Sequence, residues 1–263
     1  MEQNDTKNKR FFYANEINAG LYDGTIELVV PFYKELHEMM NYLIINEIKT
    51  KNYSENSEIL LLDIGSGTGN DSIPLLDVVP NLKIVALDFM EPMHGIYKGN
   101  LGNKQSNVEF LIADILDDKL STTMSQQFKK GFNVIISAFT IHHFCWDDKV
   151  KIYDLIYRLL GQDGIFVNGD LFNFNDDLIS QYAHKFDINF IIDNFKRTAQ
   201  NYINGNRKIE KLGELWKLHY ESDNLLNPIN DQIKLLKSLG FTSVENPFRF
   251  WQVGLLYAKK NEK

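Results

Sequence analysis

The chain has 263 residues, of which 44% are hydrophobic and 24% charged, a composition typical of a globular protein with a sizeable core. Its formal net charge of -7 argues against a nucleic-acid partner, because a protein that grips nucleic acid usually carries a basic surface that neutralises phosphates. A single cysteine excludes an internal disulfide and a zinc pattern, and the polar start and the lack of a long apolar run predict a cytoplasmic protein with no metal and no membrane partner.

Residues 1–52 are predicted to form a helical N-terminal cap. After a polar tail, residues 11–51 place apolar side chains at three- and four-residue spacing, which is the pattern of amphipathic helices. A polar break at 51–57 separates this cap from residues 53–263, which we expect to form the main domain.

The main domain alternates short apolar runs with helical stretches. This alternation predicts a parallel sheet with helices on both faces, since strands that are buried on both faces are apolar throughout. Two connecting segments, 72–79 and 149–160, are predicted crossover helices. The five predicted strands are 59–63, 83–88, 108–114, 134–137 and 164–168.

The last third of the chain departs from this alternation. Residues 172–227 have helical periodicity and many aromatic side chains, and we expect about 173–227 to form a helical lid inserted after the fifth strand. An amphipathic helix follows and ends at Gly240. The two closing runs, 241–245 and 248–259, predict an antiparallel hairpin that finishes the sheet.

A glycine-rich turn directly after the first strand is the strongest signal of a ligand site. Gly65, Ser66, Gly67 and Gly69 form this turn, where glycines let the backbone bend tightly and approach a ligand. The spacing G-x-G-x-G differs from the dinucleotide pattern G-x-G-x-x-G, and no Lys or Arg follows to meet a phosphate. Asp63 precedes the turn and suits a cationic amino group. The turn therefore favours a nucleoside with a zwitterionic amino-acid tail over a pyrophosphate.

Acidic residues end the second and third strands as well. Asp88 can accept hydrogen bonds from both ribose hydroxyls, and the following Phe89 and Met90 can pack on the faces of adenine. Asp114, with Ile115 beside it, is placed to accept from the adenine amino group. The alternative is that each acid caps the next helix. Three acids at successive strand ends beside a glycine turn favour the ligand interpretation.

The order of these elements resembles the class I S-adenosylmethionine-dependent methyltransferases, from about residue 11 to 260. The resemblance implies an α/β, Rossmann-like fold with a seven-stranded, mostly parallel sheet and one antiparallel strand. It also implies S-adenosylmethionine (SAM) as the cofactor and S-adenosylhomocysteine (SAH) as its product. The turn 161–164 departs from the proline and paired glycines that the family often has there. The matching pieces are 62–69, 86–88, 113–115, 134–144, 159–167 and 239–258.

The resemblance places the segment after the fourth strand beside the methyl group of the donor. In the family this stretch lines the site, which makes Ser137 a candidate donor contact and Phe139 a candidate wall of the acceptor pocket. His142 or His143 can serve as a general base, because a neutral imidazole titrates near working pH. A structural role for either histidine is the alternative.

Aromatic residues of the cap and the lid complete the candidate site. Tyr22 is our first choice for a contact with the sulfonium, since an electron-rich ring attracts a cation. Tyr182, Trp216 and His219 of the lid are candidates for binding an apolar or aromatic acceptor. The alternative is that these rings only pack the cap and the insertion onto the sheet.

We expect methyl transfer from SAM to an O, N or C atom of a small molecule, with a homodimer left open. One alternative is a carboxy-S-adenosylmethionine synthase of wobble-uridine modification, which the cap, the segment 139–142 and the terminal hairpin also resemble. Such an enzyme needs an arginine for an extra carboxylate, and Arg197 or Arg207 is the candidate here. The other alternative is a non-catalytic protein that binds the donor or another nucleotide.

Overall fold

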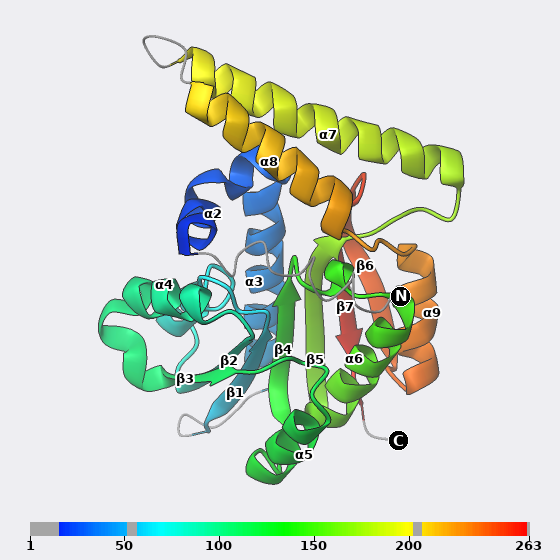
Figure 1. Ribbon diagram of the computed structural model, residues 1–263. Helices are drawn as coiled ribbons and strands as arrows, with labels where there is room; N and C mark the ends of the chain where they lie inside the picture. Colours follow the sequence, from blue (N-terminus) through cyan, green and yellow to red (C-terminus); the bar gives the residue numbers. More distant parts are fainter. Residues whose placement is uncertain (1–15, 52–56, 202–206, 262–263) are drawn as a thin grey trace.

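The computed structural model describes residues 16–51, 57–201 and 207–261, and a single seven-stranded sheet forms its centre (Figure 1). The strand order is β3-β2-β1-β4-β5-β7-β6. All pairs from β3 to β5 are parallel, whereas β7 runs antiparallel to both β5 and β6. This confirms the predicted Rossmann-like sheet with one antiparallel strand. The strands are β1 (Ile59–Ile64), β2 (Leu82–Asp88), β3 (Val108–Ile112), β4 (Phe132–Ala138), β5 (Leu160–Leu171), β6 (Ser243–Phe250) and β7 (Val253–Lys259).

Each central strand contributes to two separate hydrophobic cores. Successive side chains of a strand point to opposite faces, so Leu61 lies in one buried cluster and its neighbour Leu62 in the other. Ile136 and Ile135 of β4 are divided in the same way. Both faces are covered, and this is why the strands read as continuous apolar runs in the sequence.

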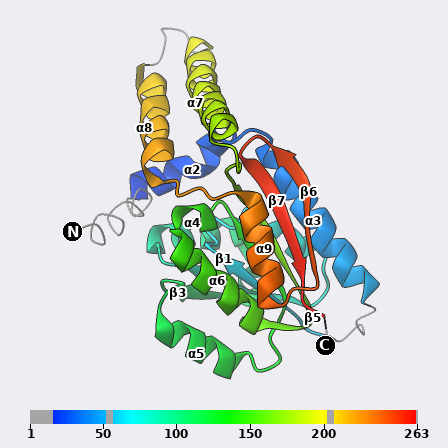
Figure 2. The ribbon, with the colours of Figure 1, turned by 90° about the vertical axis from the view of Figure 1, so that its right-hand side faces the viewer.

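Helices cover the two faces of the sheet (Figure 2). On one face lie α2 (Glu16–Val29), α3 (Tyr33–Thr50) and α4 (Glu91–Leu101), whose buried side chains include Leu36, Met40 and Tyr97. On the other face lie α5 (Asp118–Gln127), α6 (Trp146–Leu159) and α9 (Ile229–Leu239). Short 3-10 helices connect them: η2 (Ile73–Asp77), η3 (Gly102–Asn107) and η4 (Ile141–His143).

The insertion after β5 forms a helical hairpin that rises beyond the sheet (Figure 1). Its helices are α7 (Asp177–Gln200) and α8 (Arg207–Asp223), and we call this hairpin the lid. The lid touches the cap, because the side-chain amide of Asn194 donates to the backbone oxygen of Leu28 at 3.2 Å. Most described residues in the ranges predicted as cap and lid are helical, and the division into a cap, a main domain and a lid stays a prediction. Residues 1–15, 52 and 202–206 of those ranges lie outside the described residues.

Two predictions of local structure are wrong. The segment 72–79 is not a crossover α-helix but the single 3-10 helix η2, with Pro74 in its first turn and Pro80 shortly after its end. The terminal hairpin does not turn between 245 and 248, since the Asn246–Pro247 pair forms a bulge inside β6 and the chain reverses at 251–252. Proline is tolerated in β6 because it is an edge strand, where one row of N–H groups has no partner strand.

In the part of the chain that the structure describes, no helix combines the length and the apolar character that crossing a bilayer requires.

Candidate active site

A cavity of about 340 Å³ opens at the carboxyl ends of the parallel strands, where ligands of open α/β sheets usually bind. Ile64, Asp88 and Ala138, from the ends of β1, β2 and β4, contribute to its wall. The predicted site residues that line it are Tyr22, Gly65, Gly67, Asp88, Phe89, Met90, Asp114, Ile115, Phe139, His143 and His219.

The glycine turn after β1 needs glycine for two different reasons. Gly65 has a φ of 69°, and a Cβ there would lie 2.1 Å from the hydroxyl oxygen of Thr140, so sterics between β1 and β4 exclude a side chain. Gly67 has a φ of 50° and faces the cavity, and a Cβ there would meet no atom closer than 3.8 Å. The turn therefore presents bare backbone to a ligand at Gly67.

Asp88 is 5% exposed and holds the glycine turn while it faces the cavity. One carboxylate oxygen accepts from the Gly67 N–H and the other from the Met90 N–H, both at 2.9 Å. Burial raises the pKa of Asp88, and these N–H bonds oppose that shift. Each oxygen has a second lone pair, so the carboxylate can still accept from two ribose hydroxyls.

Beyond β3, Asp114 and Ile115 form the far end of the cavity. Asp114 is exposed, and one of its oxygens accepts from the Leu116 N–H at 3.0 Å, which is a local turn contact. Ile115 is 7% exposed. The pair offers an acceptor next to an apolar surface, which suits the edge and the face of a purine.

Asp63 lies beneath the glycine turn and not in the cavity wall. It is fully buried, accepts from the Ser72 hydroxyl at 2.5 Å, and Ser72 in turn lies 2.6 Å from the Tyr97 hydroxyl. Burial raises the pKa of Asp63 well above its usual range, and Asp71 adds to that shift. In this structure Asp63 ties β1 to the residues after the turn, and its predicted donor contact stays a prediction.

Three more predicted donor contacts lie outside the cavity wall. Ser66 is buried and its hydroxyl lies 3.3 Å from the His94 ring, and Gly69 packs against Tyr97. Ser137 is fully buried and donates to the backbone oxygen of Ile64 at 3.0 Å. These residues fix the shape of the turn from behind.

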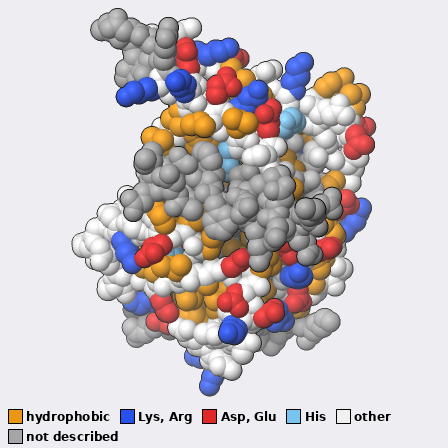
Figure 3. Space-filling model, in the orientation of Figure 1, with side chains coloured by type: hydrophobic (Ala, Val, Ile, Leu, Met, Phe, Trp, Pro, Cys, Tyr) orange, Lys and Arg blue, Asp and Glu red, His pale blue; other side chains and the backbone are white. Residues whose placement is uncertain are grey.

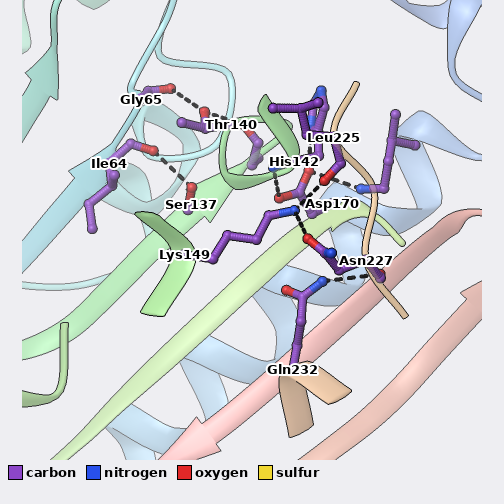
Figure 4. Close-up of polar contacts among 12 residues, drawn as sticks. Ile64, Gly65, Ser137, Thr140, His142, Lys149, Asp170, Leu225, Asn227 and Gln232 are labelled. Atoms are coloured by element: carbon purple, nitrogen blue, oxygen red, sulfur yellow. Dashed lines mark hydrogen bonds and ion pairs between the residues drawn. The ribbon is translucent and has the colours of Figure 1, made fainter. Parts of the chain in front are cut away.

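The structure separates the two adjacent histidines of η4. His143 lines the cavity, whereas His142 is 5% exposed and lies behind it. His142 Nδ1 lies 2.5 Å from Asp170 Oδ1, and its backbone N–H donates to Asp170 Oδ2 at 3.1 Å (Figure 4). The centroids of the two imidazole rings are 3.9 Å apart. Asp170 was not predicted as a partner, although its position near the end of the fifth apolar run parallels the three acids that were.

Phe139 and the cap form the wall beside this turn. Phe139 has a φ of 46°, unusual for a residue with a side chain, and its N–H donates to the Gly169 oxygen at 2.9 Å. Its ring stacks on Tyr33 of α3 at 5.7 Å between centroids. Tyr22 of α2 lines the same cavity.

The lid brings one of its three predicted residues to the cavity. His219 of α8 lines it, with its ring 5.7 Å from that of His143. Trp216 is 3% exposed and donates from its indole N–H to the Thr25 hydroxyl of α2 at 3.1 Å, so it joins the lid to the cap. Tyr182 of α7 is 54% exposed and lies outside the cavity wall.

The sequence did not lead us to predict a contact between the cap and the glycine turn. Asp23 of α2 accepts from the Thr68 hydroxyl at 2.6 Å and from the Asn70 side-chain amide at 2.8 Å. Asn70 also donates to the Tyr33 hydroxyl at 3.3 Å. Thr68 and Asn70, which follow Gly67 and Gly69, could have indicated this contact, because their polar side chains can hydrogen-bond to a neighbouring element.

These features fit the cofactor that the resemblance implies. Bare backbone at Gly67, a ribose acceptor at Asp88 and an apolar far end suit a nucleoside. Among the described residues of the cavity wall there is no Lys or Arg that a pyrophosphate would call for. Tyr22 and Phe139 provide aromatic rings in the cavity wall, a type of group that attracts a sulfonium.

Comparisons with known proteins agree with the fold. A family model described as a methyltransferase domain matches residues 61–164. The chain is 26% identical over 246 residues to the carboxy-S-adenosyl-L-methionine synthase of Nautilia profundicola, covering 92% of this chain and 91% of the relative. It is 24% identical over 261 residues to the enzyme of the same name from Helicobacter pylori strain J99, covering 98% and 97%.

Among solved structures, a DszA carbon methyltransferase superposes with a TM-score of 0.60 at 16% identity, covering 90% of this chain. This chain spans 57% of the length of that one. A likeness at such low identity concerns the fold. The fold, the glycine turn with Asp88 and the matched methyltransferase domain at residues 61–164 support a class I S-adenosylmethionine-dependent methyltransferase.

Proposed function

We propose that this enzyme methylates an oxygen atom of a small acceptor that binds between His143 and His219. The observation that carries the proposal is the pair of imidazole rings, one from the turn after β4 and one from the lid, 5.7 Å apart in the wall of a single cavity. Tyr22 and Phe139 contribute aromatic rings to the wall of the same cavity.

The chemistry of two neutral imidazoles favours oxygen over nitrogen as the acceptor atom. A neutral imidazole has one N–H donor and one bare nitrogen. A hydroxyl gives its proton to the bare nitrogen of one ring, accepts from the N–H of the other ring on one lone pair, and keeps a second lone pair for attack on the methyl carbon. An amine has a single lone pair, so an imidazole donor aimed at it would compete with the attack.

When bound, SAM supplies an activated methyl group on a sulfonium, so the protein has to position the acceptor and remove its proton. His143 would accept the hydroxyl proton at a ring nitrogen, which would leave the acceptor oxygen an electron pair for the methyl group that bound SAM would supply. His142, oriented by Asp170, supports the His143 ring from behind. The lid and Tyr22 keep water away from the cavity.

The size and the surroundings of the cavity favour a small acceptor. Ligand pockets usually measure roughly 300–1,000 Å³, and this one, at about 340 Å³, lies near the lower limit of that range. On the face drawn in Figure 3, basic and acidic side chains are interspersed and do not form one basic patch. Together with the net charge of -7, this gives little support to a nucleic-acid acceptor.

The proposal is tested by donor binding and by turnover. We expect SAH to bind in calorimetry, and SAM to be converted to SAH with phenols but not with matched anilines. His143→Gln should lower kcat by about 10²–10⁴-fold without weakening SAH binding, since a general base contributes that much. His184→Gln, a half-buried histidine outside the cavity wall, is the control. A preference for anilines, or full activity in His143→Gln, contradicts the proposal.

A second candidate is carboxy-S-adenosylmethionine synthesis. The two relatives carry the name of that synthase, and the chain matches them over nearly their whole length. Against it, the described cavity wall holds no arginine for an additional carboxylate. Arg197 is exposed on α7 and is not part of that wall, and the side chain of Arg207 lies outside the described residues. Mass spectrometry of the nucleoside that co-purifies with the protein separates the two: a mass one carboxyl group above that of SAM supports the synthase.

A further inference from the structure

We propose that Lys149 is a positioning residue whose buried ammonium group fixes the returning end of the lid against the histidine turn. The inference rests on the proposed function, in that it explains how His219 of the lid keeps its place opposite His143. Lys149 itself does not line the cavity, and it acts through the segment that joins α8 to α9.

Lys149 has no exposed surface, although it carries an ammonium group on the covering helix α6. Burial of a charge is costly unless hydrogen bonds replace the lost water. Here Nζ donates to the backbone oxygen of Leu225 at 2.5 Å and to the side-chain oxygen of Asn227 at 2.6 Å. Figure 4 shows the lysine reaching from α6 to this segment. The protein therefore places a desolvated cation at the point where the lid ends.

The same segment bonds directly to the histidine turn. The Leu225 N–H donates to the backbone oxygen of His142 at 2.8 Å, while the Leu225 oxygen accepts from Lys149. The His142 N–H in turn donates to Asp170. One residue thus connects the lysine to the turn that carries the candidate base.

The two ends of the lid are also tied to one another at this place. The Asn173 N–H, where the chain leaves for the lid, donates to the Asn227 oxygen at 2.9 Å. The Asn173 oxygen accepts from the Arg249 guanidinium at 2.9 Å. Any group that fixes the position of Asn227 therefore fixes both ends of the lid. Lys149 is the charged group that holds it.

The charged and titratable groups around Lys149 come from β5, α6 and η4. Asp170 of β5 and Cys145 at the start of α6 favour its charged form, and burial, which is the largest cause, lowers the pKa of Lys149 to about 8. His142 of η4 lies on the other side of Asp170, and the Tyr153 hydroxyl of α6 is bonded to Gln232 of α9. Buried Lys149 becomes neutral above pH 8, whereas an exposed lysine does so only near its ordinary pKa of 10.5, so opening of the lid anchor should become less favourable as pH rises above 8.

The test uses the full chain and needs no acceptor. Lys149→Met keeps the length of the side chain and removes its donors. Lys151→Met, on the same helix and with a side chain 69% exposed, is the matched control. We expect amide hydrogen exchange in the peptide 219–228 to rise at least about tenfold in Lys149→Met only, because local opening governs exchange there. Exchange in β1 and the Kd for SAH should stay unchanged.

A pH series distinguishes positioning from a general loss of stability. In the wild type, exchange of the peptide 219–228, corrected for its intrinsic pH dependence, should fall as pH rises above 8, and this step should be absent from Lys149→Met. Unchanged exchange, or a step that persists in the variant, overturns the inference. If Lys149→Met does not fold, Asn227→Ala removes one acceptor and should give a smaller rise. Failure of methyl transfer with every oxygen acceptor defeats the proposed function but leaves this exchange result standing.

Discussion

Replacing Asp187 with Asn is expected to stabilise the protein at alkaline pH and to have little effect in acid. Asp187 is 1% exposed in α7, where the Tyr220 hydroxyl lies 2.8 Å from its Oδ2 and also 2.8 Å from the side-chain oxygen of Gln252. One hydroxyl proton cannot serve two acceptors. A protonated Asp187 resolves this, because it donates to Tyr220 and leaves the hydroxyl to donate to Gln252. An Asn side-chain amide can make the same bond without ever ionising.

The size of the effect follows from the pKa. Burial raises the pKa of Asp187 from 3.8 to about 7. A raised pKa means that the stability is fully present below pH 3.8 and is lost as pH rises to 7, because the unfolded chain releases the proton first. The difference of about 3 pH units is worth roughly 4 kcal/mol, an upper value for pH 8, and about 1.6 kcal/mol at pH 5. For a chain of this size, 4 kcal/mol corresponds to about 10 °C in Tm.

The assay is urea unfolding of wild type and Asp187→Asn at pH 5 and at pH 8. The advantage of the variant should grow by roughly 2–3 kcal/mol between these two pH values. Asp193→Asn, an exposed carboxylate on the same helix, should change stability by less than about 0.5 kcal/mol at either pH. An advantage that is the same at both pH values refutes the idea that Asp187 is held neutral by the lid.

Three further substitutions probe the site. Gly65→Ala should destabilise the protein by about 2–5 kcal/mol in urea unfolding, since the new Cβ meets Thr140 and φ is positive; a fully stable variant contradicts the steric argument. Asp88→Asn should weaken SAH binding by about 10–150-fold in calorimetry, the value of one charged hydrogen bond; unchanged affinity would remove Asp88 from the donor site. Trp216→Phe should cost about 1–2 kcal/mol by losing its bond to Thr25, and thermal unfolding that matches wild type argues against that contact.

The sequence predicted the sheet well because both faces of its central strands are buried. A nearly continuous apolar run such as 83–88 does not fit a strand that exposes one face to solvent. The helical stretches between the runs imply that the strands are parallel. Parallel strands end at one edge, so acids that end successive strands come together there. Asp88 and Asp114 could therefore be predicted to share a cavity, as the structure shows.

Side-chain direction at the edge of the sheet could not be predicted in the same way. Asp63 and Ser137 each lie near a strand end, yet they point behind the glycine turn, because the turn reverses direction within a residue or two of them. Trp216 and His219 lie three residues apart on one helix, but one packs against the cap and the other faces the cavity. The rotation of a helix about its axis depends on what it packs against, and spacing alone does not fix it.

Contacts between distant segments could not be predicted from the sequence. The bond from Lys149 to Leu225 spans 76 residues, and nothing in either local pattern indicates it. A lysine on a predicted helix is usually solvated, so its burial is visible only once α6 and the segment after α8 lie side by side. The pairing of His142 with Asp170, which are 28 positions apart in the sequence, is hidden in the same way.

The hydrogen bonds from Thr68 and Asn70 to Asp23 have a kinetic consequence. They fasten α2, which carries the cavity-lining Tyr22, to the glycine turn, and we expect spent SAH to leave only while that fastening is undone. The frequency of this opening then sets an upper limit on turnover that no acceptor, however reactive, can exceed. A rapid first turnover followed by a slower steady rate would be its signature, and loosening Asp23 would raise the second rate without changing the first.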